Sequence, residues 1–537
     1  MAVNESRTFT VENNVYKGEI TCTPKSIGEI LWNNIKSHGN KIAQIDACTE
    51  QVVTYAELQN KVVKCALWLQ KQGIKLCDIV SLCTSNHFNS FVPCLATIYV
   101  NAIFNPWEEN MNLQEKRVYV MRLTTPKMIF CTEKSVNVIL SAIKKSNSNP
   151  IVVIFGNHLN VISFFDILTM CSDAEVTTFH YVECNVMDRK KTMCIMHSSG
   201  STGLLKGVEL SNYCLSYVSK DKNIDFTDTP IWFSTLYWVL GVMMNLFSIV
   251  QSAKVILYPE FDEEMICLLI EKYKITTVFL TSSMIHRFLK AGYIKKFPLL
   301  SLKVIFFGGG PIKPKTHEEI RRILSHVQIL QCYGMTEVAG YRTLQCLNHK
   351  NGSCGTVIQN TEIKIVDLES GKALGSNQLG ELWIKSVTQI NGYYRNLEVT
   401  KKTVDEQGWL HSGDIGYFDE DGELFIVDRI KDLIKYRGYH ISSGEIEGVL
   451  LSHPGVSEVA VTGIPHPTDD EYPIAYVTKM PGIEVTEQEL IDLVANNMTD
   501  QYKLRGGVIF LNELPHTSTG KIAKNILKAM AKKLVVE

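Results

Sequence analysis

Short apolar segments rich in β-branched residues recur up to about residue 430, and amphipathic segments of helical length separate many of them. Apolar runs of this kind predict buried strands, and their alternation with helices predicts mostly parallel sheets covered on both faces. The strands expected from this pattern are 78–83, 127–131, 151–155, 192–196, 254–257, 276–280, 303–307 and 327–330. The fold class that follows is α/β.

Helical segments and turns divide the chain further. Thr54 and Glu57 have the spacing of a capping box, and residues 263–273 and 315–324 are expected helices. After about Gly355 the segments shorten and turns become frequent, with Asp421-Gly422 as a hairpin turn inside 417–427. The chain after Arg429 has its own apolar pattern and predicts a small α+β domain. The expected domains are therefore 1–429 and 430–537.

The segment from Ile231 to Val250 has no charged residue and is as long as a membrane-spanning helix. However, it contains Ser234, Thr235, Gly241, Asn245 and Ser248, and it lacks flanking basic clusters. We therefore expect a buried helix and loop inside a large α/β core, and no transmembrane segment.

Composition excludes several other classes of protein. A chain of 537 residues with 45% hydrophobic and 20% charged residues is typical of a globular protein of at least two domains. The net charge of −2 gives no global reason to expect nucleic-acid binding. The 15 cysteines form no CxxC pair, which favours reduced thiols over disulfides or zinc. A polar start and no Ser-Lys-Leu end lead us to expect a cytoplasmic protein.

The strongest local signal for chemistry is the segment HSSGSTGLLKG, residues 197–207. Its small hydroxyl residues and glycines allow backbone N–H groups to converge on an anion, and Lys206 adds a positive charge. It is not a Walker loop. A flexible Ser/Gly linker is the alternative, but the strand expected before it favours a phosphate-binding loop.

A second signal is QCYGMTE, residues 331–337, at the end of an expected strand, where α/β proteins bind ligands. Tyr333 is suited to stacking on a purine, Thr336 to bonding a phosphate oxygen and Glu337 to holding Mg²⁺. A plain strand-to-helix turn is an equal alternative.

Three further motifs are weak when taken singly. Glycines 308–310 either allow the backbone to approach a flat ring closely or simply form a tight turn. Asp414 in HSGD offers a carboxylate for ribose hydroxyls or is a solvated charge. Lys521 follows a turn containing Pro515 and Gly520. It either stabilises negative charge that develops during the reaction or is an ordinary surface lysine.

Taken together, SSGSTGxxKG, QCYGMTE, HSGD, DRIKDLIKYRGYHI and PxxxTGK resemble the adenylate-forming superfamily in order and spacing. That superfamily includes acyl-CoA synthetases, 4-coumarate–CoA ligases, firefly luciferase and nonribosomal adenylation domains. The resemblance covers about residues 24–527, and insect luciferase-like acyl-CoA synthetases look most similar. It implies a large domain of two parallel-type sheets plus a β-rich subdomain, followed by a small mobile domain. It also implies ATP, Mg²⁺ and coenzyme A as cofactors and a small carboxylic acid as substrate.

The resemblance assigns site residues one by one. Glu337 would bind Mg²⁺, Thr336 would meet the α-phosphate, Lys521 would bridge the carboxylate and the α-phosphate, and Lys431 would be the hinge. The residues implied for the β- and γ-phosphates are Ser198, Ser199, Gly200, Ser201, Thr202, Gly203 and Lys206. Those implied for the adenosine are Gly308, Gly309, Gly310, Pro311, Gln331, Cys332, Tyr333, Gly334, Asp414 and Arg429, and those facing coenzyme A are Lys435, Arg437 and Gly438.

The chain also departs from the family pattern. Trp238 stands where most relatives carry a histidine beside the acyl carboxylate, so we expect slower adenylation or a reshaped pocket. Leu205 replaces a proline, Cys332 a glycine, Ser443 a proline and Phe307 a small residue.

Three functions fit the sequence. An acid–thiol ligase is favoured, because Val239 and Tyr341 add bulk at positions that shape the beetle luciferin pocket, while Gly340 stands at a serine position. An insect luciferase that oxidises another adenylated luciferin with O₂ is the alternative. A degraded non-catalytic binder is the third. Trp232, Leu236 and Met243 add to a greasy pocket suited to a fatty or aromatic acid.

Overall fold

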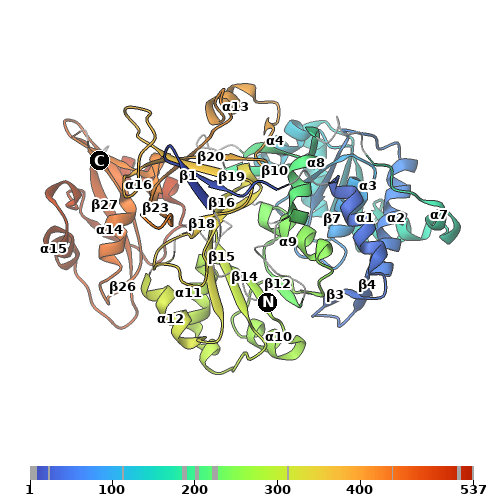
Figure 1. The fold of residues 1–537 in the computed structure, drawn as a ribbon, viewed down its shortest axis with the longest axis horizontal. Coiled ribbons are helices and arrows are strands. Elements are labelled where there is room, and N and C mark those ends of the chain that lie inside the picture. Colours follow the sequence, from blue (N-terminus) through green and yellow to red (C-terminus); the bar gives the residue numbers. More distant parts are fainter. Residues whose placement is uncertain are drawn as a thin grey trace.

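The computed structural model describes residues 9–21, 25–109, 111, 114–183, 190–199, 205–220, 228–310, 312, 314–437, 439–516 and 522–534. Figure 1 shows the small domain at one end of the long axis and the N-terminal helices α1–α3 at the other. The predicted fold class, an α/β protein with a large N-terminal and a small C-terminal domain, is confirmed.

The first α/β layer is an eight-stranded sheet whose six strands from β10 to β9 run parallel. In spatial order its strands are β21 (Gly392–Tyr393), β11 (Leu205–Ser211), β10 (Thr192–Ser199), β6 (Ile103–Trp107), β5 (Ile79–Cys83), β7 (Met128–Thr132), β8 (Ile151–Phe155) and β9 (Ile162–Ser163). The strands β5, β7 and β8 match the predicted ones to within a residue. β5 and β7 are buried along their whole length and β8 over its last three residues, which is why they appear as continuous apolar runs.

The second α/β layer is a six-stranded sheet, parallel from β12 to β16 and antiparallel beyond. Its strands are β12 (Pro230–Trp232), β14 (Thr277–Thr281), β15 (Val304–Gly308), β16 (Gln328–Met335), β17 (Gly340–Leu344) and β18 (Thr356–Val357). A three-stranded sheet of β13 (Val255–Leu257), β3 (Ile42–Asp46) and β4 (Val52–Thr54) lies beside it. The strand expected to end at residue 330 continues to Met335, because its outer part pairs with β17 instead of β15.

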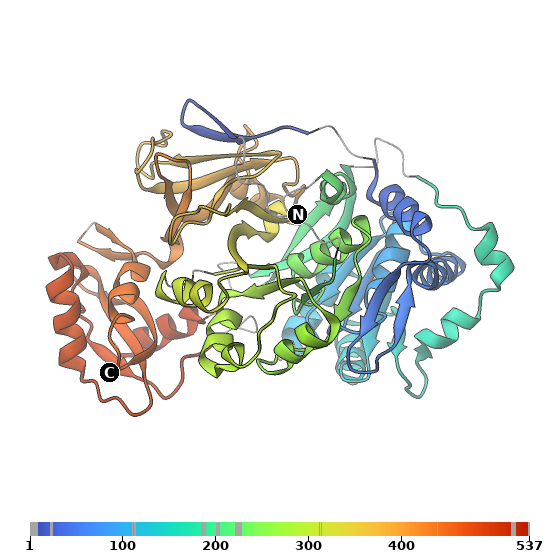
Figure 2. The ribbon, with the colours of Figure 1, turned by 60° about the horizontal axis from the view of Figure 1, so that its bottom comes forward.

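Helices cover these sheets (Figure 2). Those of the large domain are α1 (Ile27–Ser37), α2 (Tyr55–Lys71), α3 (Phe91–Tyr99), α4 (Gln114–Thr124), α5 (Val136–Ser146), α6 (Phe164–Thr169), α7 (Asp173–Thr178), α8 (Asn212–Ser216), α9 (Val239–Val250), α10 (Met265–Tyr273), α11 (Ser282–Ala291), α12 (Pro314–Ile323) and α13 (Leu397–Thr403). The capping box of Thr54 and Glu57 is confirmed at the start of α2.

The apolar segment from residue 231 to 250 is divided between β12, a loop and α9, which begins directly after Trp238. Most of its side chains are buried in the core, as expected. Among the described residues, no helix is long and apolar enough to span a bilayer.

The β-rich part is an antiparallel six-stranded sheet that combines the chain's first strands with residues after 360. Its order is β1 (Phe9–Glu12), β2 (Val15–Gly18), β19 (Thr361–Val366), β20 (Gly380–Ser386), β22 (Leu410–Phe418) and β23 (Leu424–Arg429). The predicted turn at Asp421-Gly422 connects β22 and β23, and Gly422 has a φ of 75° there.

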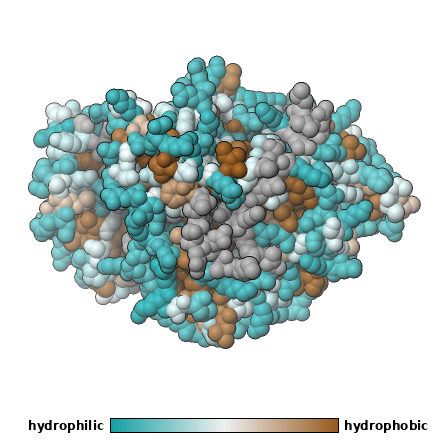
Figure 3. Space-filling model, viewed as in Figure 1, coloured by the Kyte–Doolittle hydropathy of each residue, from teal (hydrophilic) through white to brown (hydrophobic). Residues whose placement is uncertain are grey.

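The small domain has a five-stranded sheet and its own hydrophobic core. Its strands are β25 (Tyr439–Ile441), β24 (Ile434–Tyr436), β27 (Asp470–Lys479), β26 (Val456–His466) and β28 (Val508–Phe510), and its helices are α14 (Ser443–Leu450), α15 (Glu487–Asn497) and α16 (Lys524–Leu534). A short 3₁₀ turn, η5 (Ile430–Asp432), connects it to β23. On the face drawn in Figure 3, apolar side chains form separate small patches in a mostly hydrophilic surface.

Candidate functional site

The two strands that flank the predicted phosphate-binding loop, β10 and β11, form an antiparallel hairpin. Ser198 on β10 pairs with Lys206 on β11, and Ser199 pairs with Leu205. Lys206 therefore lies on a strand, and its Nζ is 4.8 Å from the centre of the Tyr393 ring. The predicted residues Gly200, Ser201, Thr202 and Gly203 lie outside the described residues, as does the side chain of Ser199.

Glu337 connects this hairpin to the end of β16. It lies in the 3₁₀ turn η4 (Thr336–Val338), and its side chain is 7% exposed. Its Oε1 accepts hydrogen bonds from Ser198 Oγ at 2.9 Å and from the Tyr393 hydroxyl at 3.0 Å. Burial and then the adjacent Glu337 raise the pKa of Tyr393, so its hydroxyl remains a donor. Sequence reasoning missed Tyr393, because nothing in its local pattern indicates a contact with residues so distant in the chain.

The neighbourhood of Glu337 is suited to a hard cation. A carboxylate with two hydroxyl groups offers the oxygen donors that Mg²⁺ prefers. In the described part of the chain, no group of three or more His, Cys, Asp or Glu side chains could hold a metal. A Mg²⁺ ion at Glu337 would leave coordination positions for water and for the phosphates of a nucleotide.

A second cluster forms around Asp414, which is 3% exposed on β22. The Tyr333 hydroxyl donates to Asp414 Oδ2 at 2.7 Å, and Arg429 Nε lies 2.9 Å from Asp414 Oδ1. Burial and then Asp414 raise the pKa of Tyr333, and Asp414 raises that of Arg429. The carboxylate of Asp414 therefore lies between the Tyr333 hydroxyl and the Arg429 guanidinium. The structure thus brings together Tyr333, Asp414 and Arg429, which sequence reasoning assigned to one nucleoside.

The glycine turn after β15 lies directly against β16. A Cβ on Gly308 would be 2.9 Å from both the carbonyl oxygen and the Sγ of Cys332, and Gly309 has a φ of 82°. Both positions therefore require glycine. Gln331 is buried beside this turn, and its Oε1 accepts no hydrogen bond from the described residues. Such an acceptor is suited to an exocyclic amino group. Pro311 lies outside the described residues.

Gly334 and Thr336 complete this end of β16. A Cβ on Gly334 would be 2.0 Å from the carbonyl oxygen of Gly340, so this glycine allows β16 and β17 to approach closely. Thr336 begins η4 and is half-buried. It lies directly beside Glu337 in the chain.

His197 lies on β10 of the same hairpin, opposite Gly207, and had no separate role in the sequence analysis. It is 2% exposed, and burial lowers its pKa to about 4, so the imidazole is neutral. Its Nε2 lies 2.9 Å from Asn105 Nδ2, which also donates to the Ile195 carbonyl, so Nε2 is the acceptor and Nδ1 carries the proton. The Tyr237 ring stacks over the imidazole at 6.4 Å, and Trp238 meets Tyr237 edge-on at 4.7 Å.

Ala339, two residues beyond Glu337 in the chain, is one of the residues that line a small, partly open hollow of about 40 Å³. Its walls are mostly apolar, as predicted for Met243 and Tyr341. Its other end contains Arg342, which is 6% exposed, and Gln359, whose Oε1 accepts no hydrogen bond from the described residues. No local pattern in the sequence indicates these two residues, because β17 and the segment before β19 meet only in the fold. Trp232, Leu236, Trp238 and Val239 are not among the residues that line this hollow.

The remaining predicted residues belong to the small domain and its connection. Lys431 is exposed in η5, and Lys435 is exposed on β24. Arg437 Nε pairs with Asp469 Oδ1 at 2.8 Å. These side chains do not join the clusters around Glu337 and Asp414 in the described part of the structure. Gly438 and Lys521 lie outside the described residues.

Comparison with known proteins identifies the family. A profile described as AMP-binding enzyme matches residues 31–394, and one for the AMP-binding enzyme C-terminal domain matches residues 445–521. The chain belongs to the AMP-binding, adenylate-forming enzyme family. This confirms the resemblance inferred from the motifs.

Individual relatives in the family have different activities. The chain is 33% identical to luciferin 4-monooxygenase of Photinus pyralis, over 97% of this chain and 98% of the relative. It is 30% identical to the 4-coumarate–CoA ligase CCL1 of Humulus lupulus, over 94% and 93%. Sequence identity alone therefore does not choose between a luciferase and a ligase.

Solved structures support the fold of this family member. ATP-bound MatB from Rhodopseudomonas palustris superposes with a TM-score of 0.86 at 24% identity, over 95% of this chain and 99% of that one. The luciferase-like enzyme from the nonluminescent Zophobas morio mealworm gives 0.72 at 26% identity, over 78% and 100%.

Proposed function

We propose that this enzyme is an ATP-dependent acid–thiol ligase. In this proposal it joins a carboxylic acid to AMP with release of pyrophosphate, and then transfers the acyl group to the thiol of coenzyme A with release of AMP. The acid is fatty or aromatic. The observation that carries the proposal is the pair of carboxylates, Glu337 and Asp414, held by separate hydrogen-bonding partners on one side of the large domain.

Each carboxylate is suited to a different part of ATP. Asp414 is oriented by Arg429 and Tyr333, so its oxygens are suited to accept hydrogen bonds from the two ribose hydroxyls. Gln331 and the turn at Gly308 are suited to the adenine ring. Glu337 would hold Mg²⁺ next to the phosphates, where the ion would neutralise charge on the leaving pyrophosphate.

Formation of the adenylate needs positive charge at the α-phosphorus. The acid's oxygen attacks this atom, the bond to pyrophosphate breaks, and negative charge increases on the phosphoryl oxygens. Lys521 and Thr336 are the residues we assign to stabilise that charge, with Lys206 on the departing phosphates. Because Trp238 stands where relatives carry a histidine, the neutral imidazole that remains close to the end of β10 is that of His197.

The thiol step needs a different set of groups at the same place. The sulfur attacks the acyl carbon, the bond to AMP breaks, and the thiol proton leaves to solvent. We assign Lys435, Arg437 and Gly438 to the side of the small domain that meets coenzyme A, with Lys431 as the hinge. Exchange of Lys521 for this surface by rotation of the small domain would let one site serve both steps.

We assign the acid's body to the hollow beside Ala339, whose walls would have to move apart to admit it. Tyr217, Val218, Leu240 and Phe247 give it apolar walls, and Met243 and Met244 are side chains that adapt to different shapes. Val239 and Tyr341 stand where beetle luciferases have smaller residues, which favours a ligase over a D-luciferin oxidase.

A panel assay tests the proposal. Pyrophosphate release is measured with fatty and cinnamic-type acids, with and without coenzyme A, while thioester formation and light emission are recorded. The proposal expects acid-dependent pyrophosphate release and a coenzyme A–dependent thioester. Light with no thioester would favour a luciferase, and no acid-dependent release would favour a non-catalytic binder.

A further inference from the structure

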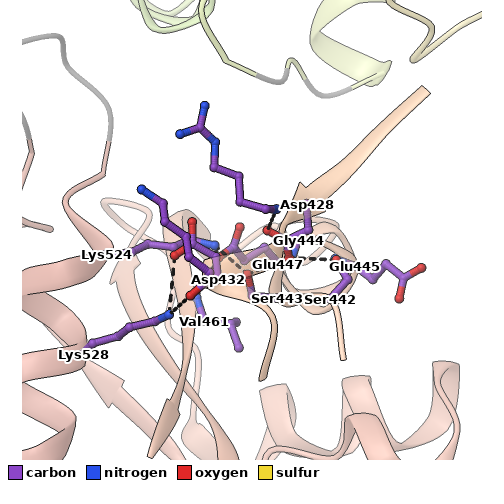
Figure 4. A network of polar contacts seen from close by, with 12 residues as sticks. Asp428, Asp432, Ser442, Ser443, Gly444, Glu445, Glu447, Val461, Lys524 and Lys528 are labelled. Atoms are coloured by element: carbon purple, nitrogen blue, oxygen red, sulfur yellow. Dashed lines mark hydrogen bonds and ion pairs between the residues drawn. The ribbon is translucent and has the colours of Figure 1, made fainter. Parts of the chain in front are cut away.

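The backbone of Asp428 belongs to the large domain, but one oxygen of its carboxylate is held by the small domain, while the other accepts from the Arg429 amide. Asp428 pairs with Ile415 in the β22–β23 ladder. Its Oδ2 accepts hydrogen bonds from Ser442 Oγ at 3.0 Å, Ser443 Oγ at 2.9 Å and the Gly444 amide at 3.1 Å (Figure 4). All three donors lie at the start of α14, where an anion also interacts favourably with the helix dipole.

The contact extends into the small domain through a buried chain of polar groups. Ser443, which is 0% exposed, also accepts a hydrogen bond from Lys524 Nζ on α16 at 2.7 Å. Lys524 pairs with Glu447 Oε1 at 2.7 Å, and this oxygen also accepts from the Val461 amide of β26 at 2.8 Å. One carboxylate of the large domain is therefore connected to α14, α16 and β26 (Figure 4).

The residues after Asp428 are attached in a different way. Arg429 pairs with Asp414 inside the large domain. By contrast, Lys528 on α16 donates to the Lys431 carbonyl at 2.6 Å and lies 3.5 Å from Asp432 Oδ1. The attachment therefore changes from one domain to the other between Arg429 and Lys431. The rotatable part of the connection lies between these two residues, and the side chain of Asp428 contacts the small domain on the far side of it.

Few other polar contacts fix the orientation of the small domain. Among the described residues, the hydrogen bonds and ion pairs that join residues from 433 onward to the earlier chain all end on residues 428–432. A rotation about 429–431 would leave the Lys528 contacts intact. It would break all three bonds to Asp428 at once, because they converge on one oxygen.

We infer that Asp428 and Ser443 form a latch that holds the small domain in this orientation and must open when the domain rotates. Asp428 is a positioning residue for the proposed two-step reaction. Ser443 strengthens the latch, because its hydroxyl both donates to Asp428 and accepts from Lys524. The family's usual proline at this position would offer neither contact.

Trypsin cleavage tests the latch without any substrate. The connection carries trypsin sites at Arg429, Lys431, Lys435 and Arg437. We expect Asp428→Ala to increase the cleavage rate in this stretch at least about fivefold, since loss of about 1 kcal/mol of net hydrogen bonding corresponds to such a factor. Asp428→Asn and Ser443→Ala should give intermediate increases.

Two controls separate the latch from general loss of stability. Thr486→Ala removes the capping box of α15 in the same domain, away from the connection. It should leave cleavage at the connection unchanged. X-ray scattering of the intact full-length chain should show a broader distribution of domain distances for Asp428→Ala than for Thr486→Ala. Equal cleavage and scattering for Asp428→Ala and the wild type, or an equal effect of Thr486→Ala, would overturn the inference.

Enzyme activity supplies a third measurement, and the interpretation of this measurement rests on the proposed function. Asp428→Ala should change acyl-adenylate formation and acyl transfer from supplied acyl-AMP to coenzyme A in unequal proportion. A merely misfolded variant would lose both equally. If the wild type adenylates no acid, the proposed function fails, whereas the latch is still decided by cleavage and scattering.

Discussion

Ser198 Oγ donates a hydrogen bond to Glu337 Oε1 at 2.9 Å, although 139 residues separate the two along the chain. Ser198 is the next-to-last residue of β10 in the first α/β sheet, and Glu337 follows β16 of the second. The contact therefore joins the proposed phosphate-binding hairpin to the proposed cation ligand at the boundary of the two layers. It shows how two motifs that are weak alone become one site in the fold.

Glu337→Gln tests the cation assignment. The amide keeps an acceptor for Ser198 and Tyr393 but loses the charge that attracts Mg²⁺. We expect ATP–pyrophosphate exchange to fall by about 10², the usual scale for losing one electrostatic contact at a reacting group. Exchange is measured against Mg²⁺ concentration. Glu209→Gln, a half-buried glutamate bonded to Thr192, is the matched control, and an equal loss there would contradict the assignment.

Tyr333→Phe tests the orientation of Asp414. Loss of the 2.7 Å hydrogen bond leaves Asp414 held by Arg429 alone. We expect KM for ATP to rise about fivefold with little change in kcat, because a single hydrogen bond contributes about 1 kcal/mol and is made before and during reaction. Steady-state kinetics with ATP varied supply the measurement. A fall in kcat with KM unchanged would place Tyr333 in the chemical step instead.

Lys521→Ala and Lys435→Ala test the division of labour in the small domain. Lys521→Ala should lower acyl-adenylate formation by about 10²–10³ and leave transfer from supplied acyl-AMP to coenzyme A largely intact. Lys435→Ala should give the reverse pattern. Lys435 is exposed, so its loss should not change thermal stability. Equal losses of both half-reactions in either variant would refute the two-conformation mechanism.

Local signals in the sequence predicted much of this fold. The capping box of Thr54 and Glu57 and the strands at 151–155 and 303–307 depend on neighbours in the chain, so composition and spacing reveal them. The motifs likewise located Tyr333, Asp414 and Arg429. Their mutual contacts were implied only by resemblance to a family.

The rest depends on contacts between distant segments. Tyr393 reaches Glu337 only because β21 pairs with β11. Gln359 lines the hollow only because the chain passes it just before entering β19, a strand of another sheet. The strand containing Gln331 extends beyond its predicted end because pairing with β17 holds residues 332–335 extended. Hydrophobic periodicity carries no information about such pairing.

His197→Gln tests the buried imidazole by its effect on stability. The pKa of His197 falls from 6.5 to about 4 in the fold, so the stability it contributes is present above pH 6.5 and is lost as the pH falls toward 4. At pH 5 the loss is about 2 kcal/mol. Urea unfolding of the large domain at pH 7.5 and 5.0 should therefore show that the free energy of unfolding falls less at pH 5.0 in the variant than in the wild type. Exposed His180→Gln is the control and should keep the wild-type loss.

Trp238→His tests the chain's main departure from its family. Trp238 directly precedes α9, and its ring packs edge-on against Tyr237, which lies over His197. Histidine at this position would add a hydrogen-bond donor near the acid's carboxylate but remove that packing. We expect lower activity on the protein's own acid and relaxed selectivity, because Val239 and Tyr341 have also changed and indicate a repacked pocket. The measurement is pyrophosphate release by the wild type and the variant across fatty and cinnamic-type acids. Uniformly higher rates in the variant would mean that Trp238 merely weakened an ancestral site, since a repacked pocket would lose its fit to at least one acid.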